Sequence, residues 1–240
     1  WAATWRAEGA SETYAVSRSL DGGASWTTPA LMVGAGSSMT LAFSPTFATD
    51  GVVFAAGSAD PGPYRSNDGG MTWLPTGWYD PAQSYKDGLV AGRVFDIAPV
   101  PTHFLDGTVF AATTIGVARS PSSGADWFQM NAGLPELTVF GLDTAPNNSG
   151  ILLAGVSYFE NLRVLTSSPG EYDGGLFRSS DGGQTWRAVA GGLDQPTAVT
   201  FATPDVAFAT TGTIGSGGFA SGGIYRSLDG GENWEQVFSG

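Results

Sequence analysis

The sequence contains no cysteine, a single histidine and a single lysine. Without cysteine, neither a disulfide framework nor a thiolate metal site can form, and with His103 alone a histidine-based zinc or iron site is excluded. We therefore expect no metal and no cofactor, with calcium binding through oxygens at Asp50-Gly51 or Asp106-Gly107 left as an open alternative. Lys86 is the one lysine and the formal net charge is −12, which argues against a nucleic-acid partner because phosphates require a basic surface.

The absence of long apolar runs and the low content of lysine and cysteine bear on the location of the protein. No apolar run approaches the roughly 20 residues that a membrane-spanning helix needs, so we expect no membrane span. The acidic, lysine-poor and cysteine-free composition is typical of proteins outside the cytoplasm, and we expect an extracellular, cell-surface or periplasmic location. The sequence begins at Trp1 without an initiator methionine or a signal-like segment, which favours a chain that is processed or belongs to a longer protein.

The most prominent feature of the sequence is a repeated phrase of nine residues. Its last copy reads Arg-Ser-Leu-Asp-Gly-Gly-Glu-Asn-Trp, and a degenerate copy at 119–127 has Ser122 in place of the aspartate. Every copy opens with an arginine. Recurrence at roughly 50 residues indicates a repeat architecture. The copies lie at 18–26, 65–73, 119–127, 178–186 and 226–234.

Each copy separates two short runs of strand-forming residues, and the second run is predicted to begin at the closing Trp or, in the second copy, at Met71. Asp-Gly-Gly between such runs indicates a hairpin, because tight turns need a positive φ that glycine adopts without steric cost. The Asp carboxylate can accept hydrogen bonds from backbone amides of its own turn, and the Ser hydroxyl assists it. We expect the closing Trp to anchor the hairpin as a large apolar side chain.

The pattern Ser-x-Asp-x-Gly-x-x-Trp resembles the Asp-box, or BNR, repeat of β-propellers. The resemblance covers most of the chain and implies an all-β propeller. It also implies that each box stabilises the turn between the third and fourth strands of a blade, away from the face that usually binds ligands. The family includes sialidases, xyloglucan-degrading hydrolases, sortilin-type receptors and photosystem-assembly factors, so the box indicates fold more strongly than function. The matching box residues are Asp21, Trp26, Asp68, Trp73, Trp127, Asp181, Trp186, Asp229 and Trp234.

The strand pattern predicts one domain over 1–240, built as about five four-stranded blades. No stretch has helical periodicity, and the glycine-rich stretch 212–223 is expected to be a flexible loop. The first blade has only three predicted strands and lacks its innermost one. We therefore expect either a five-bladed ring that closes imperfectly, a larger ring, or a strand supplied by another chain. The predicted blades span about 1–34, 39–76, 93–131, 138–190 and 197–239.

Two long loops carry aromatic residues together with charges of both signs, at 75–93 and 157–175. Loops longer than about 12–15 residues are often functional, and binding residues favour loops on a rigid scaffold. We interpret them as a sugar or peptide groove; alternatively, they are solvated loops whose aromatic residues pack on a neighbouring blade or subunit. The candidate ligand-binding residues are Trp78, Tyr79, Asp80, Asp87, Tyr158, Glu160, Arg163 and Tyr172.

A catalytic role requires more than these loops provide in sequence. Glycoside hydrolysis uses two carboxylates about 5–10 Å apart, for which Asp80 or Asp87 with Glu160 or Glu171 are candidates. The Arg-Ile-Pro segment of sialidases is absent, so a sialidase is disfavoured, and we assign no catalytic residue.

The sequence thus favours a non-enzymatic, exported module that binds a protein or a glycan, or that assembles into a larger extracellular complex. The expected partners are protein subunits or a glycan, with further blades or chains to complete the first blade. Two alternatives stay open. One is a carbohydrate-active glycoside hydrolase that uses carboxylates on the long loops, and the other is a structural subunit of a surface layer or filament.

Overall fold

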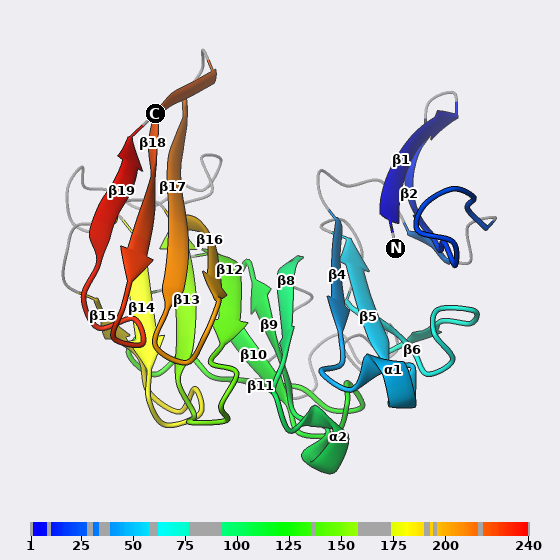
Figure 1. Cartoon of the computed structure of the whole chain (residues 1–240), viewed down its shortest axis with the longest axis horizontal. Coiled ribbons are helices and arrows are strands. Elements are labelled where there is room, and N and C mark those ends of the chain that lie inside the picture. The colour runs from blue at the N-terminus through cyan, green and yellow to red at the C-terminus, as the bar shows by residue number, and fades with distance from the viewer. Residues whose placement is uncertain are drawn as a thin grey trace. The chain divides into compact units, whose positions relative to one another are not determined.

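The described residues of this computed structural model form five β-sheets, one of three strands and four of four strands (Figure 1). This arrangement confirms the all-β fold, including a first sheet with three strands. The structure describes residues 2–8, 11–27, 31–33, 39–57, 62–76, 93–135, 138–157, 174–189, 193, 196–215 and 218–239.

Each sheet consists of consecutive strands that pair antiparallel in chain order. The first sheet contains β1 (Ala2–Glu8), β2 (Ser11–Ser17) and β3 (Leu31–Val33). The second contains β4 (Met39–Phe43), β5 (Val53–Gly57), β6 (Tyr64–Ser66) and β7 (Leu74–Pro75). The third contains β8 (Val94–Pro99), β9 (Val109–Thr113), β10 (Gly116–Ser120) and β11 (Phe128–Gln129).

The last two sheets repeat this plan. The fourth contains β12 (Thr138–Thr144), β13 (Leu152–Ser157), β14 (Gly175–Ser179) and β15 (Arg187–Ala188). The fifth contains β16 (Pro196–Phe201), β17 (Ala207–Gly215), β18 (Gly218–Ser227) and β19 (Glu235–Ser239).

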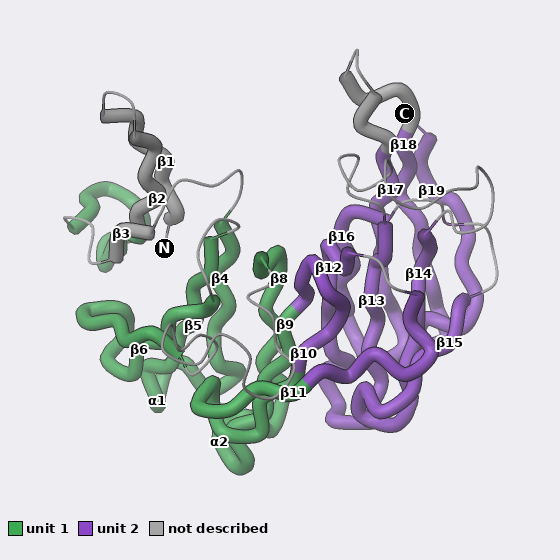
Figure 2. Tube along the Cα trace, turned by 180° about the vertical axis from the view of Figure 1, so that it is seen from behind, with its two compact units in different colours: residues 1–111, 119–128 green, residues 112–118, 129–240 purple. Residues whose placement is uncertain are grey.

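The chain divides into two compact units (Figure 2). The first comprises residues 1–111 and 119–128, and the second comprises residues 112–118 and 129–240. That all 240 residues form one domain stays a prediction.

The core of the second, third and fourth sheets lies on their second strands. Strands β5, β9 and β13 are short apolar runs, buried at every residue, as expected for strands covered on both faces. By contrast, β7, β11, β15 and β19 are exposed at every residue. Small residues let neighbouring sheets approach: a Cβ on Gly141 in β12 would lie 2.8 Å from Ala198 Cα in β16.

The expectation that the chain has no helix is wrong at two points. The link between the first and second strands contains one helical turn in the second sheet, α1 (Phe47–Asp50), and one in the third, α2 (His103–Asp106). Each ends at a glycine in the left-handed region, Gly51 or Gly107, as is usual for a helix C-terminus. A four-residue helix is too short to show a 3.6-residue period, which is why the sequence pattern misses it.

Two further expectations need correction. In the stretch 212–223, predicted to be a flexible loop, residues 212–215 and 218–223 extend strands β17 and β18, with pairs such as Gly212 with Gly222 and Gly215 with Gly218. The outer strands of the second to fifth sheets also begin after the closing tryptophan of the repeat, not at or before it. The reason is that these tryptophans belong to the turn.

Candidate functional site

The repeated phrase folds into a turn that we call the box turn, numbered from its serine (position 1) to its tryptophan (position 8). Ser179 shows the pattern in the fourth sheet: its Oγ donates to Asp181 Oδ1 at 2.8 Å and accepts from the Gly183 N–H at 2.9 Å. Asp181, at position 3, also accepts from the N–H and hydroxyl of Thr185, at 2.9 and 2.6 Å. The carboxylate therefore closes the turn through both oxygens.

The same bonds recur around Asp21, Asp68 and Asp229. They have an electrostatic consequence. Donors at position 7, from the side chain and the backbone, lower the pKa of all four aspartates from 3.8 to about 2. A carboxylate with so low a pKa is a poor proton donor at neutral pH, so these four groups are unsuited to general acid catalysis.

The tryptophan at position 8 completes the turn. In Trp26, Trp73, Trp127 and Trp234 the indole N–H donates to the carbonyl of position 5, at 3.1–3.2 Å. Trp186 differs, because its indole N–H reaches Met130 O at 2.8 Å, on the chain that leads out of the third sheet.

The degenerate copy in the third sheet forms the same turn, with the residue types of positions 3 and 7 exchanged. Position 3 is Ser122 and position 7 is Asp126, so the acid lies where the other turns have a hydroxyl or an amide. Ser122 Oγ accepts from the Asp126 N–H at 2.9 Å and donates to its carboxylate at 3.3 Å. The degenerate copy is therefore a box turn in which the side-chain donor is at position 3 and the side-chain acceptor is at position 7.

Position 4 links the box turns of the second to fifth sheets to their own sheets. Its N–H donates to a carbonyl in the link between the first and second strands, at 2.7–2.9 Å. The pairs are Gly69 with Gly51, Ser123 with Gly107, Gly182 with Gly150, and Gly230 with Asp205.

The carbonyl of position 4 receives a bond from the sheet before it. The donor is the arginine that precedes position 1 of the previous box turn, which we call the leading arginine. The three observed pairs are Arg18 Nη1 with Gly69 O (2.8 Å), Arg65 Nη1 with Ser123 O (3.3 Å) and Arg178 Nε with Gly230 O (2.9 Å). Arg119, the leading arginine of the third sheet, bonds within its own sheet to Thr108 Oγ1 at 3.4 Å.

An apolar contact accompanies this bond. In two of these three pairs, the second strand of the earlier sheet places a large side chain against the position-5 glycine of the later box turn. A Cβ added to Gly231 would lie 2.7 Å from Leu153, and one added to Gly124 would lie 3.7 Å from Phe54. We call the leading arginine, this apolar side chain and the later box turn together the joint.

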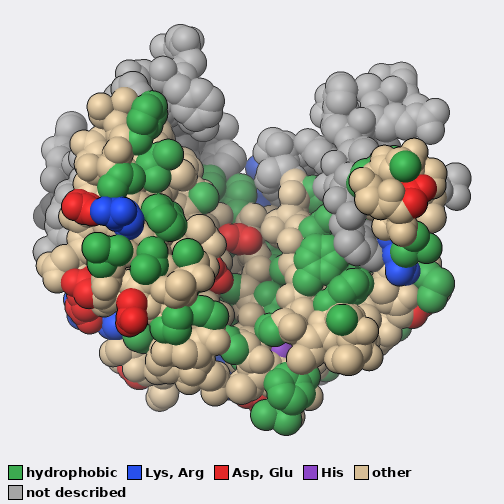
Figure 3. Space-filling model, viewed as in Figure 1, with side chains coloured by type: hydrophobic (Ala, Val, Ile, Leu, Met, Phe, Trp, Pro, Cys, Tyr) green, Lys and Arg blue, Asp and Glu red, His purple; other side chains and the backbone are tan. Residues whose placement is uncertain are grey.

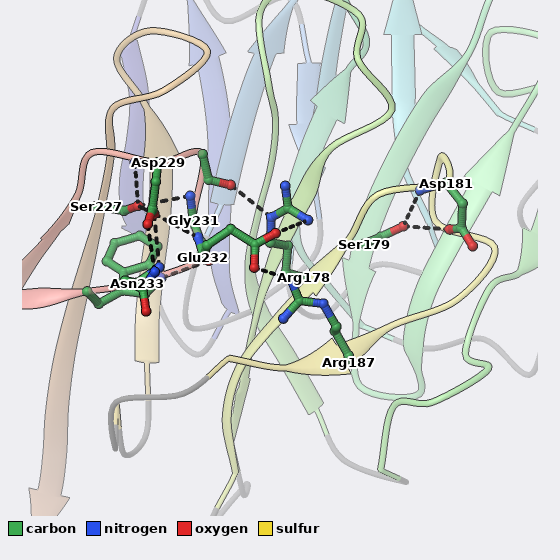
Figure 4. A network of polar contacts seen from close by, with 11 residues as sticks. Arg178, Ser179, Asp181, Arg187, Ser227, Asp229, Gly231, Glu232 and Asn233 are labelled. Atoms are coloured by element: carbon green, nitrogen blue, oxygen red, sulfur yellow. Dashed lines mark hydrogen bonds and ion pairs between the residues drawn. The ribbon is translucent and has the colours of Figure 1, made fainter.

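The joint between the fourth and fifth sheets carries an additional carboxylate (Figure 4). Glu232, at position 6, forms an ion pair with Arg178 at 3.0 Å and another with Arg187. The Arg178 side chain is 8% exposed, whereas that of Arg187 is 52% exposed. Because an exposed pair is weakened by solvent, Arg178 is the partner that contributes to stability.

A polar cluster lies beneath the joint between the second and third sheets. His103, at the start of α2, is 3% exposed, meets Phe54 edge to face and lies 3.2 Å from Ser123 Oγ through Nε2. Burial, and then the nearby Arg65, lower the pKa of His103. The α2 turn therefore buries His103.

Asp143, on β12, is a largely buried acidic group that bonds to the next sheet. It accepts from the N–H groups of Thr144 and Phe201, both at 2.8 Å, and from the Thr200 hydroxyl at 3.2 Å. Burial nevertheless raises its pKa. The bonds from β16 make Asp143 a connector of the fourth and fifth sheets.

Two further observations concern metal sites and membrane-spanning helices. Within the described ranges, no group of three or more His, Asp or Glu side chains is placed to hold a metal ion. No helix in that part of the chain has the length and apolar character to cross a bilayer.

The predicted ligand-binding residues lie outside the described residues. Four fall in 77–92 and four in 158–173. They are Trp78, Tyr79, Asp80, Asp87, Tyr158, Glu160, Arg163 and Tyr172. The strands that flank these segments are described: β7 runs away from the box turn before 77–92, and β13 ends at Ser157 before 158–173. Each loop therefore joins its own sheet at the end opposite the box turn.

Sequence reasoning missed the joint. The signal was present, because an arginine opens every copy of the repeat. Its partner was not visible, because the acceptor is a backbone carbonyl about one repeat further along the chain.

No protein-family model matches the chain, and no curated protein sequence matches it. Solved structures do. The GH74 enzyme of Niastella koreensis is similar with a TM-score of 0.65 and 16% identity, over 96% of this chain and 34% of that one. This chain has a β-propeller fold.

Two other propellers are similar. The GH74 xyloglucanase of Xanthomonas campestris gives a TM-score of 0.54 and 20% identity, over 82% of this chain and 29% of that one. YCF48 from Cyanidioschyzon merolae gives 0.55 and 15%, over 94% and 63%. The chain spans between 24% and 34% of the length of the GH74 chains, and at these identities the likeness establishes the propeller fold alone.

Proposed function

We propose that this propeller is a non-catalytic binding module that holds a macromolecular partner, a glycan or a protein, on the loops 77–92 and 158–173. The observation that carries the proposal is the position of the strand ends that flank these segments, Pro75 of β7 and Ser157 of β13. Both strand ends lie opposite the box turn, and the box-turn end is held by hydrogen bonds within and between sheets. Long loops on a rigid scaffold are the usual carriers of binding residues.

The composition of the loops supports a glycan as the partner to test first. Trp78, Tyr79 and Tyr172 offer flat apolar surfaces on which a sugar ring can stack, and Asp80 and Glu160 offer hydrogen-bond acceptors. The box aspartates supply none of this chemistry, because their oxygens are occupied inside the turns.

The experiment is affinity electrophoresis of the folded protein in gels that contain soluble xyloglucan or other soluble polysaccharides. Xyloglucan is included because one similar propeller is a xyloglucanase. We expect one polysaccharide to retard the protein, and Trp78→Ala or Tyr172→Ala to weaken binding about tenfold by removing a stacked aromatic ring. Phe128→Ala is the matched control, because Phe128 is an exposed aromatic residue on the outer strand β11. Equal retardation of all variants would contradict a role for the loops.

A glycoside hydrolase is the second candidate, favoured by the similarity to GH74 enzymes. Its carboxylates would come from the loops, with Asp87 and Glu160 as the first to test. A hydrolase releases reducing sugar and loses turnover, but not binding, in Asp87→Asn or Glu160→Gln. A binding module releases none in the wild type.

We also propose that the protein acts outside the cytoplasm, at a cell surface or in the periplasm, in keeping with its acidic and cysteine-free composition. Fractionation of the source cells with an antibody against the chain tests this location. Recovery of the protein in the cytoplasmic fraction alone would contradict it.

A further inference from the structure

The joint between the second and third sheets departs from the repeat at two positions, and the two residues concerned are in contact. His103 begins α2 where Phe47 begins α1. Ser123 stands at position 4 of its box turn with a φ of 55°, whereas the other four box turns have glycine there. Ser123 Oγ lies 3.2 Å from His103 Nε2. A positive φ is unfavourable for serine but not for glycine, so we expect this side-chain contact to have a role of its own.

Three polar side-chain atoms around this contact are buried and have no hydrogen-bond partner. They are Arg65 Nε, Thr76 Oγ1 and His103 Nδ1, and the described part of the chain contains no others of this kind. Arg65 donates to Ser123 O through Nη1, and His103 contacts Ser123 Oγ. The Thr76 methyl group lies 2.8 Å from a Cβ placed on Gly124. Because buried polar groups in folded proteins are almost always hydrogen-bonded, three around one turn indicate a ligand.

The three atoms can all act as hydrogen-bond donors. Arg65 Nε can only donate, and the Thr76 hydroxyl can donate. Burial lowers the pKa of His103, so its ring is neutral at pH 7 and carries one proton. We assign that proton to Nδ1, with Ser123 Oγ donating to Nε2. His103 is 3% exposed and shows only a small purple area at the surface in Figure 3, so its Nδ1 requires an acceptor inside the protein.

The fifth sheet shows which acceptor a leading arginine takes at such a joint. Arg178 pairs with the carboxylate of Glu232, at position 6 of the later box turn, at 3.0 Å. In the joint of Arg65, position 6 of the later box turn is Ala125, which has no carboxylate. Within the residues that the structure describes, Arg65 forms no ion pair.

Two acidic groups act on this cluster through their charge. The charge of Asp50 acts on Arg65 and His103, and that of Asp106 acts on His103. Both carboxylates accept hydrogen bonds next to their own helical turns, from Ser44, Thr46 and Val52 for Asp50 and from Thr108 for Asp106. Their charge offsets part of the positive charge of Arg65, so a monovalent anion suits the cluster better than a divalent one.

We propose that the joint between the second and third sheets binds one small monovalent anion, of the size of chloride, through Arg65 Nε, His103 Nδ1 and the Thr76 hydroxyl. The anion has the role that Glu232 has beside Arg178. It suits three donors better than a water molecule does, since water has two protons of its own to place and a charged acceptor forms the stronger hydrogen bonds. All these residues of the site belong to the first compact unit, and the inference does not depend on the proposed binding function.

The first experiment is thermal unfolding of the full chain, followed by circular dichroism, in sodium bromide that replaces sodium gluconate at constant ionic strength. Gluconate is too large for the site, and bromide substitutes for chloride. A ligand that binds only the folded state raises the melting temperature as its concentration increases, and we expect a rise of about 3 °C at roughly 0.1 M bromide. In crystals soaked in bromide, an anomalous-scattering peak should lie within hydrogen-bonding distance of Arg65 Nε and His103 Nδ1.

Ala125→Glu is the most specific variant, because it supplies the carboxylate that Glu232 supplies in the fifth sheet. It should raise the melting temperature in gluconate by about 3 °C and abolish the response to bromide. Gln129→Glu is the matched control, since it adds the same charge to an exposed residue of the same sheet and should keep the full response. His103→Phe should weaken bromide binding about tenfold, because it removes one donor while keeping a ring as in Phe47.

Three results would overturn the proposal. One is a wild-type melting temperature that is the same in bromide and in gluconate, which would mean that these atoms have no anionic partner. Another is an equal response to bromide in the wild type, Ala125→Glu and His103→Phe, which would place the anion elsewhere. The third is an anomalous map without a peak beside Arg65. Circular dichroism before heating verifies that each variant is folded.

Discussion

Arg18 and Gly69, 51 residues apart in the chain, are joined by a hydrogen bond of 2.8 Å from the guanidinium to the carbonyl oxygen. The N–H of the same Gly69 donates to Gly51 O at 2.9 Å. One residue of the box turn therefore fixes the turn to its own sheet through its N–H and to the previous sheet through its carbonyl. The box is a connector between sheets as well as a hairpin turn.

Arg178→Ala should lower the free energy of unfolding by about 2–3 kcal/mol, because it removes a charged hydrogen bond and leaves the Gly230 carbonyl buried without a donor. Arg187→Ala is the control. It removes an exposed ion pair with the same Glu232, and should change stability by no more than about 0.5 kcal/mol. Urea unfolding of both variants measures the difference. Equal effects would mean that the bond across the joint contributes nothing.

The reversed box turn of the third sheet predicts a strong coupling between two substitutions. Ser122→Asp alone should destabilise the protein by about 1 kcal/mol, because it places a second carboxylate against Asp126. Adding Asp126→Thr should restore stability, since it recreates the arrangement of Asp68 with Thr72. A double-mutant cycle of unfolding free energies measures the coupling. Strictly additive effects would show that the two residues do not act as a pair.

The box aspartates predict a loss of stability in acid. Their folded pKa of about 2 lies below the ordinary value of 3.8, so the unfolded chain takes up these protons first. Their contribution is therefore complete above pH 3.8 and is lost as the pH falls from 3.8 towards 2. Asp68→Asn should flatten the dependence of the melting temperature on pH in that window. An unchanged slope would contradict the assignment.

His103 predicts a second window, nearer neutrality. Its folded pKa is lowered from 6.5 by burial and by the charge of Arg65, although Asp50 and Asp106 oppose that shift. The unfolded chain thus binds this proton more readily, and stability should fall as the pH drops below 6.5.

His103→Phe, which copies Phe47 of the equivalent turn α1, should remove that fall while keeping the apolar contact with Phe54. Urea midpoints of both proteins above and below pH 6.5 provide the measurement. A wild type as stable below pH 6.5 as above it would contradict the prediction.

The repeat spacing and the apolar runs were sufficient to predict the sheets, because hairpin turns and buried strands are local features. Val53 to Gly57 in β5 is an example: its apolar run predicted a strand, and a strand is observed. The same local reasoning failed at Trp73 and Trp186, which were assigned to strands, because their indole N–H groups bond within the turn or across to Met130 O.

The joint could not be predicted from the sequence, for a different reason. Sequence patterns show side chains, but half of the joint is a backbone carbonyl, and the arginine that reaches it belongs to another sheet. The exchange of Ser122 and Asp126 was equally hidden. In the sequence, the absence of the aspartate at position 3 suggested a degenerate copy of the repeat. The hydrogen bonds between Ser122 and Asp126 show instead that the turn is preserved and that the two positions have exchanged their hydrogen-bonding roles.

The polarity of the joint has a consequence for how such a chain can lengthen. In each of the three joints, the earlier repeat supplies an arginine and the later repeat supplies a carbonyl. A gene duplication that copies one whole repeat therefore adds one donor and one acceptor together, and the inserted unit can connect on both sides without any further mutation. A duplication of a whole repeat thus keeps each arginine of a joint matched to a carbonyl as soon as it occurs. A duplication of half a repeat would leave one arginine or one carbonyl without its counterpart.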